Sequence, residues 1–185
     1  MISLRKIISS YRMLEARDFS CVLCPLPEKI ADEIREWGKK NIAEEDLTGD
    51  GREPNIHVTL LYGLHGHDPF EIRTLVWNFG KVDITLGDVT LFSQPEHDVV
   101  KIDVVSQDLQ KLHNQIAEAV ENTQSFPEYL PHITVSYVRP GTGQKYAGSK
   151  IFADQEITLD SALFSGNDYR ETELRFNPHL HNPEE

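Results

Sequence analysis

The chain has 185 residues, of which 39% are hydrophobic and 26% charged, so it is long enough for one globular domain with a sizeable core. Its formal net charge of −12 repels polyphosphate, which argues against an extended nucleic-acid-binding surface but allows a small nucleotide or an RNA end in a local site. No apolar run is long enough to span a bilayer and no secretory signal is recognisable, so we expect a cytoplasmic protein without membrane contact.

The first third of the chain predicts an arm, a strand and a helix. We expect residues 1–17 to form an N-terminal arm, in which apolar residues recur at helical spacing. The apolar run 19–26 predicts a strand. Pro27 opens a helix whose end we expect at Gly38 and the lysines that follow it. Residues 44–55 are polar, which predicts a loop leading into the next strand.

The two cysteines, Cys21 and Cys24, fall in the first predicted strand. They form a lone Cys-x-x-Cys without the second pair that a zinc site needs. Three residues apart on a strand, they point to opposite faces and are poorly placed to form a disulfide. We therefore expect two buried thiols, and no metal or other cofactor.

The stretch from His57 to Tyr62 is rich in β-branched and aromatic residues, which predicts a strand. Side chains alternate on a strand, so His57 and Thr59 share one face. Val58 and Leu60 share the opposite, core-facing side, and we expect Tyr62 on that side too. This strand therefore offers one imidazole and one hydroxyl on a single face.

A turn follows, in which His65, His67 and Asp68 suggest a metal site. A short His-x-His in a turn is more often solvated, so we assign it no metal. A helix is expected to follow as far as Trp77 or Phe79.

The central part of the chain predicts two strands and a helix. Residues 81–92 read as extended structure, and apolar residues alternate over 99–105. Ser106 is a good N-cap for a helix over 107–121, on which His113 is expected to be exposed or to cap.

A second stretch, from His132 to Tyr137, closely repeats the first. His132 and Thr134 are expected on one face of the strand, with Ile133 and Val135 on the other. Tyr137, like the earlier tyrosine, is expected to face away from its own His. One such strand is usually an ordinary surface or core strand, whereas two in matching contexts favour a shared site.

Residues 140–148 contain three glycines and predict a mobile loop directly after the second motif. A lysine in this loop can meet a phosphate, and a tyrosine can stack on a base. The candidate substrate contacts are Arg139, Lys145, Tyr146, Tyr62 and Tyr137.

The C-terminal part predicts strands over 156–164 and 171–176, joined by a turn at 166–168, and a flexible tail over 177–185.

The order strand, helix, loop and His–Thr strand occurs in residues 19–62 and recurs in 99–137. We therefore expect one domain over 18–176, of class α+β. It should have two related lobes whose largely antiparallel sheets line a central cleft, with helices packed outside.

Two His–Thr strands suit the cleavage of a phosphodiester. One group must deprotonate the attacking oxygen while a second protonates the leaving oxygen, and imidazole titrates near neutral pH. His57 and His132 are the candidate acid and base, although the sequence does not say which is which. Thr59 and Thr134 can donate to the non-bridging phosphoryl oxygens. This chemistry needs no metal.

The pattern resembles the two-histidine (2H) phosphoesterase superfamily, which includes RNA 2′-5′ ligase-like proteins and cyclic phosphodiesterases. The resemblance rests on His57-Val58-Thr59-Leu60 and His132-Ile133-Thr134-Val135. It implies a bilobal α+β fold and metal-independent chemistry on 2′-linked, 2′,3′-cyclic or small oligonucleotide phosphodiesters. One branch of the superfamily comprises phage proteins that destroy cyclic oligonucleotide immune signals, and the motif is common to all branches.

Two alternatives stay open at this point. The protein could be a module that binds a nucleotide or RNA end without cleaving it, or a structural protein with a vestigial site. The intact pair of motifs argues against the latter. Oligomeric state is open as well.

Overall fold

The computed structural model describes residues 19–66, 68–124 and 128–180, so the expected N-terminal arm and the end of the expected tail lie outside it. The α-helices of the described ranges are α2 (Glu28–Asn41), α3 (Phe70–Phe79) and α4 (Gln107–Ala119), and η1 (Glu44–Asp46) and η2 (Gly143–Tyr146) are short 3-10 helices. The strands are β1 (Ser20–Pro25), β2 (Leu47–Arg52), β3 (His57–Leu64), β4 (Val82–Ser93), β5 (Asp98–Val105), β6 (His132–Val138), β7 (Glu156–Leu159), β8 (Ser161–Ser165) and β9 (Glu171–Arg175).

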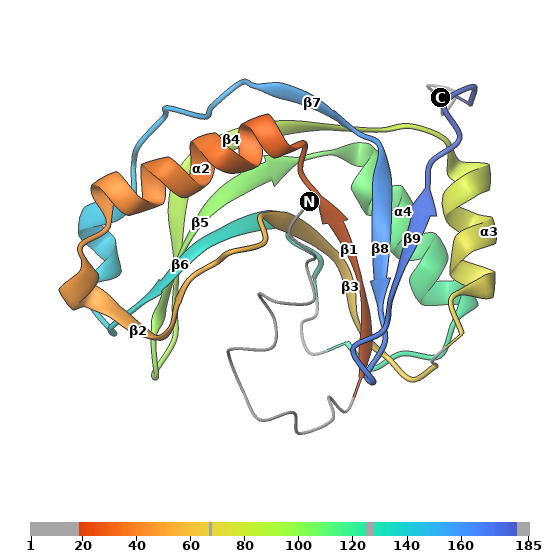
Figure 1. The fold of residues 1–185 in the computed structure, drawn as a ribbon, viewed down its shortest axis with the longest axis horizontal. Coiled ribbons are helices and arrows are strands. Elements are labelled where there is room, and N and C mark those ends of the chain that lie inside the picture. The colour runs from red at the N-terminus through yellow and green to blue at the C-terminus, as the bar shows by residue number, and fades with distance from the viewer. Residues whose placement is uncertain (1–18, 67, 125–127, 181–185) are drawn as a thin grey trace.

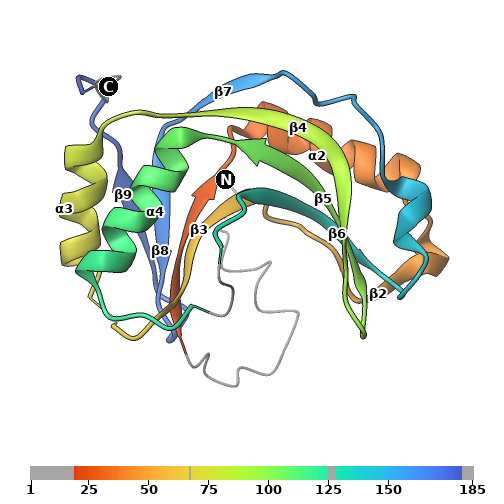
Figure 2. The same cartoon turned by 180° about the vertical axis from the view of Figure 1, so that it is seen from behind.

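The described strands form one antiparallel sheet in the order β7-β4-β5-β6-β3-β1-β8-β9, with β2 paired to β6. Strands β7 and β8 are separated along the chain by Asp160 alone, yet β7 is one edge of the sheet and β8 lies next to the other. The sheet must therefore curl until its ends approach each other, which gives the open half-barrel seen in Figure 1 and, from behind, in Figure 2. The predicted strand over 156–164 is wrong in this respect, because it divides at Asp160 into two strands with different partners.

The expected α+β class and its two lobes are confirmed. Strands β1, β3, β8 and β9 form one half of the sheet, and β4, β5, β6 and β7 form the other. The two halves meet where β3 pairs with β6 through Val58 and Ile133. Helix α2 lies against β6, whereas α4 lies against β3, so each helix covers the His–Thr strand of the other half.

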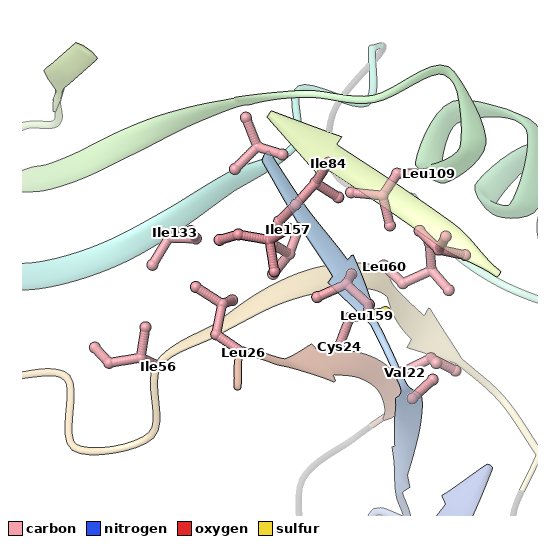
Figure 3. Close-up of a cluster of buried hydrophobic side chains, with 14 of the residues drawn as sticks. Val22, Cys24, Leu26, Ile56, Leu60, Ile84, Leu109, Ile133, Ile157 and Leu159 are labelled. Carbon is pink, nitrogen blue, oxygen red and sulfur yellow. The ribbon is translucent and has the colours of Figure 1, made fainter. Parts of the chain in front are cut away.

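The core fills the inside of the curl. In Figure 3 the labelled side chains of Val22 and Cys24 on β1, Leu60 on β3 and Ile133 on β6 converge with those of β7. Cys21 and Cys24 are both buried and no disulfide joins them, as expected. Burial raises the pKa of the Cys24 thiol to about 12, because the thiolate would have to be desolvated.

Helix α2 ends at Asn41, directly after the lysines that mark its predicted end, and Gly38 lies within its last turn. A Cβ at Gly38 would come within 3.0 Å of Val135 Cγ1. The glycine thus allows close approach of α2 to β6. The prediction of a loop over 44–55 is wrong, because these residues contain η1 and β2, and β2 pairs with β6.

Other predicted elements are confirmed. The first strand is β1, the helix ending at Phe79 is α3, and Ser106 caps α4 by accepting a hydrogen bond from the Leu109 amide at 3.1 Å.

Within the described ranges, no helix combines the length and the apolar character that crossing a membrane requires.

Candidate active site

The two motifs lie side by side at the junction of the lobes. Val58 and Ile133 are cross-strand partners in an antiparallel pair, which places His57 across from Thr134 and Thr59 across from His132. Val58 and Ile133 are fully buried, whereas the four motif side chains are half-buried. The alternation predicted for both strands is therefore present, and it assembles two imidazoles and two hydroxyls on one face.

Each histidine is held in the same way by its own backbone. His57 Nδ1 hydrogen-bonds to the carbonyl oxygen of Asn55, and His132 Nδ1 lies 2.8 Å from the carbonyl oxygen of Leu130. A carbonyl oxygen can only accept, so Nδ1 carries the proton in both rings. Nε2 is then the nitrogen that can take up or release a proton in each ring.

Lys101 and Asp103 bring charge to one side of this site. The pairing of β5 with β6 sets Lys101 opposite Thr134 and Asp103 opposite His132, so both lie on the motif face. Lys101 is only 6% exposed, forms an ion pair with Asp103 and donates to Thr90 Oγ1 at 2.8 Å. Neither was predicted, although a Lys and an Asp alternating with apolar residues in one strand is a signal for a shared polar face.

The environment of His132 favours its neutral form. Burial is the main cause that lowers the pKa of His132, and the nearby charges of Lys101 and His57 lower it further. The hydrogen bond to Leu130 and the charge of Asp103 act in the opposite direction on this pKa. His132 therefore binds a proton less readily than an ordinary histidine does.

Phe92 of β4 links Lys101 to His132. Lys101 Nζ lies 4.2 Å from the centroid of the Phe92 ring, and the same ring meets His132 edge-on with centroids 5.0 Å apart. The aromatic ring thus packs against the imidazole and covers the buried ammonium.

Tyr62 and Tyr137 lie on the motif face, so the expectation that they face away from their histidines is wrong. The pairing of β3 with β1 shifts by one residue at Leu60, and the pairing of β6 with β5 shifts by one at Val135. These are β-bulges, each at the third position after its His. A bulge resets the alternation and brings both tyrosines to the side of the His and Thr.

A buried helix residue supports the first bulge from behind. His113 on α4 is 6% exposed, and its Nδ1 lies 2.8 Å from the Leu60 carbonyl oxygen. Its ring stacks on Tyr129 at 4.1 Å, and the Tyr129 hydroxyl donates to the Thr59 carbonyl oxygen at 3.0 Å. The expectation that His113 is exposed or capping is therefore wrong, because this side of α4 packs against β3.

The other candidate substrate residues gather elsewhere, around the buried carboxylate of Asp46. Arg139 and Lys145 form ion pairs with it at 3.2 and 2.5 Å, and the Tyr146 hydroxyl donates to it. Lys145 and Tyr146 belong to η2, so the predicted loop is partly helical and tied down. Arg139 lies seven residues beyond His132, roughly 20 Å along a strand, so we leave these three residues out of the proposed site.

The turn after β3 offers no metal site among its described residues. His65 hydrogen-bonds through Nε2 to Thr123 Oγ1 at 2.7 Å, and its Nδ1 lies 3.2 Å from a Glu121 carboxylate oxygen. His67 lies outside the described residues. In the part of the chain that is described, no three His, Cys, Asp or Glu side chains are grouped to hold a metal ion.

Solved structures share this fold over most of their length. TT0787 of Thermus thermophilus has a TM-score of 0.59 at 16% identity, with 88% of this chain and 100% of that chain covered. LigT of E. coli complexed with 3′-AMP has a TM-score of 0.58 at 18% identity, with 85% and 95% covered. A structure described as a phosphoesterase has a TM-score of 0.55 at 18% identity, with 86% and 96% covered. At these identities the likeness concerns the fold.

A curled antiparallel sheet with two adjoining His–x–Thr strands defines a protein of the two-histidine phosphoesterase type. The model of the 2′-5′ RNA ligase superfamily matches residues 26–164, which is more than half of the chain. The chain belongs to the 2′-5′ RNA ligase superfamily. No curated protein sequence is similar enough to match it.

Proposed function

We propose that the protein is a metal-independent phosphodiesterase acting on 2′-linked, 2′,3′-cyclic or small oligonucleotide phosphodiesters. The observation that carries this proposal is the placement of His57 opposite Thr134 and of Thr59 opposite His132 on one polar face. Superfamily membership and nucleotide complexes of a structural neighbour, LigT of E. coli with 3′-AMP and with ATP, support a nucleotide substrate.

The reaction uses both histidines at Nε2. One removes a proton from the attacking water or ribose hydroxyl as its oxygen bonds to phosphorus, and the other gives a proton to the leaving oxygen as its bond to phosphorus breaks. With water and a 2′,3′-cyclic phosphate the product is a nucleoside monophosphate. With a 2′-5′ linkage attacked by the neighbouring 3′-hydroxyl, the products are a 2′,3′-cyclic phosphate and a free 5′-hydroxyl. Thr59 and Thr134 donate to the non-bridging oxygens, on which negative charge grows.

We assign the base to His132 and the acid to His57. Burial and the charge of Lys101 lower the pKa of His132, which keeps its Nε2 unprotonated at neutral pH. A base must start the reaction without its proton, and His132 meets this requirement.

The test is a panel of 2′,3′-cyclic mononucleotides, 2′-5′ dinucleotides and cyclic di- and trinucleotides, with products identified by mass. We expect turnover of at least one member, and a kcat lower by about 10²- to 10⁴-fold in His57→Ala and His132→Ala. His179→Ala is a matched control, because His179 is exposed and lies outside the site. EDTA should leave turnover unchanged.

The panel also separates the alternatives. Preference for the cyclic di- and trinucleotides would indicate a hydrolase of cyclic immune signals, the role of the phage branch. Tight binding without product after long incubation would contradict catalysis and indicate a binding module. Turnover that survives in His132→Ala would contradict the mechanism.

A further inference from the structure

A stacked pair of side chains packs against the first motif strand. His113 of α4 and Tyr129 lie with their ring centroids 4.1 Å apart and their planes 1° from parallel. His113 is buried, and Tyr129 is half-buried against the hydrophobic core. The proposed mechanism uses neither residue, so the role of this pair lies outside the acid–base chemistry.

The pair holds two consecutive carbonyl groups of β3. The Tyr129 hydroxyl donates to the Thr59 carbonyl oxygen at 3.0 Å, and His113 Nδ1 donates to the Leu60 carbonyl oxygen at 2.8 Å. Burial raises the pKa of the Tyr129 hydroxyl, so this group keeps its proton and remains a donor. Because the bulge of β3 lies at Leu60, these bonds fix the backbone where the strand departs from regular pairing.

The segment that carries Tyr129 leads directly into the second motif. Gln110 of α4 donates through Nε2 to the Tyr129 carbonyl oxygen at 2.8 Å, so α4 holds this residue by its ring and by its backbone. The next carbonyl group, that of Leu130, lies 2.8 Å from His132 Nδ1 and orients this imidazole. Tyr129 and Leu130 therefore connect the backbone of Thr59 to the ring of His132.

The direct pairing of the two motif strands is short. Within the described residues, β3 pairs with β6 only through Val58 and Ile133. One cross-strand pair sets the register, and Thr59 and His132 lie opposite each other just beyond it. The connection through Tyr129 adds a second fixed point on this side of the pair.

We propose that Tyr129, braced by His113, is a positioning residue that sets the spacing between the Thr59 hydroxyl and His132 Nε2. This inference rests on the proposed function, in which Thr59 donates to the phosphate and His132 is the base. Tyr129 acts on both groups through the backbone and exchanges no proton with the substrate. A misplacement of about 1 Å in an active site can lower the rate by about 10²-fold, so loss of this connection should affect kcat.

The experiment is Tyr129→Phe in the full-length protein, which removes the hydroxyl and keeps the ring that stacks on His113. On the best substrate of the panel we expect kcat to fall by about 10- to 100-fold with little change in KM, because the transition state is more sensitive to geometry than binding is. Tyr146→Phe is the matched control. It removes another tyrosine hydroxyl bonded within the protein, the donor to Asp46, which lies outside the proposed site. This control should leave kcat unchanged.

Two further readouts separate positioning from a loss of stability. Tyr129→Phe should lower kcat much less in the Thr59→Ala background, because the hydroxyl that it positions is then absent. The NMR signals of the His132 ring should shift in Tyr129→Phe and stay in place in Tyr146→Phe.

An unchanged kcat in Tyr129→Phe would overturn the positioning role while leaving phosphodiesterase activity in place. An equal fold-loss of kcat in the wild-type and Thr59→Ala backgrounds would overturn it as well. Absence of any turnover that depends on His132 would instead overturn the proposed function itself.

Discussion

Val58 of β3 and Ile133 of β6 are cross-strand partners, and this pair fixes how the two motifs face each other. Both side chains are completely buried, so each strand has one register in which its apolar residues enter the core. A slip of one residue would turn the His and Thr of that strand into the core and expose its apolar side chains. The core therefore determines the geometry of the polar face, although it takes no part in the chemistry.

The threonines are expected to act through their hydroxyls alone. Thr59→Ala and Thr134→Ala should each lower kcat by about 10²- to 10³-fold, because a donor to the developing negative charge is lost. Thr→Ser at either position keeps the hydroxyl and should recover most of this loss. Equal defects in the Ala and Ser variants at both positions would argue against the assigned role. Steady-state kinetics on the best substrate of the panel give the comparison.

The acid limb of the pH profile should respond to the charges on β5. His132 must be unprotonated to act as base, and its pKa lies below the ordinary value of about 6.5, so kcat/KM should fall only below this pH. Lys101→Met removes a positive charge and leaves the negative charge of Asp103 without its ion-pair partner. Both effects raise the pKa of His132, which should move the acid limb to higher pH. Asp103→Asn should move it to lower pH.

The opposite signs of these two variants separate an electrostatic effect from structural damage, which would lower activity at all pH values. Because the two histidines interact, the profile reports apparent pKa values of the pair. An NMR titration of the His132 ring in the same variants gives an independent reading. Shifts of the same sign in Lys101→Met and Asp103→Asn would contradict the charge effect on the pKa of His132. An acid limb that does not follow this pKa would contradict the assignment of His132 as the base.

Sequence patterns predict the two motif strands well, because alternation and β-propensity are local properties. The positions of Tyr62 and Tyr137 are missed, since a bulge at Leu60 or Val135 is visible only in the pairing with a neighbouring strand. Lys101 is missed for a related reason. Its place beside Thr134 depends on the register between β5 and β6.

Long-range partners account for the other differences. Lys145 and Tyr146 are typical of a phosphate- and base-binding loop when they are considered alone. Asp46, about one hundred residues earlier in the chain, forms an ion pair with Lys145 and accepts a hydrogen bond from the Tyr146 hydroxyl. No local sequence pattern connects these positions. His113 is likewise expected at the surface of a helix by its residue type, whereas its acceptor is the Leu60 carbonyl oxygen on another element.

The Asp46 cluster is expected to make folding sensitive to acid. Lys145 is the main cause that lowers the pKa of Asp46 to about 2, with Tyr146 and Arg139 acting in the same direction. A carboxylate whose pKa is lower in the folded than in the unfolded chain adds stability above its unfolded value of 3.8, and this stability is lost as the pH falls toward 2. Asp46→Asn should therefore lower the Tm at neutral pH and flatten its decline below pH 3.8. Asp160→Asn, at an exposed position between β7 and β8, should change neither.

The contact of α2 with the second bulge can be tested at Gly38. In an exposed helix interior, Gly→Ala adds up to about 1 kcal/mol of stability. At Gly38 the new Cβ would come within 3.0 Å of Val135 Cγ1, so Gly38→Ala should give no such gain and should destabilise the protein. Val135→Ala removes the obstructing methyl groups, and the double variant should be more stable than the sum of the single changes predicts. Urea unfolding of the wild type, the two single variants and the double variant measures this coupling. Strictly additive free energies of unfolding would contradict a steric contact between position 38 of α2 and Val135 of β6.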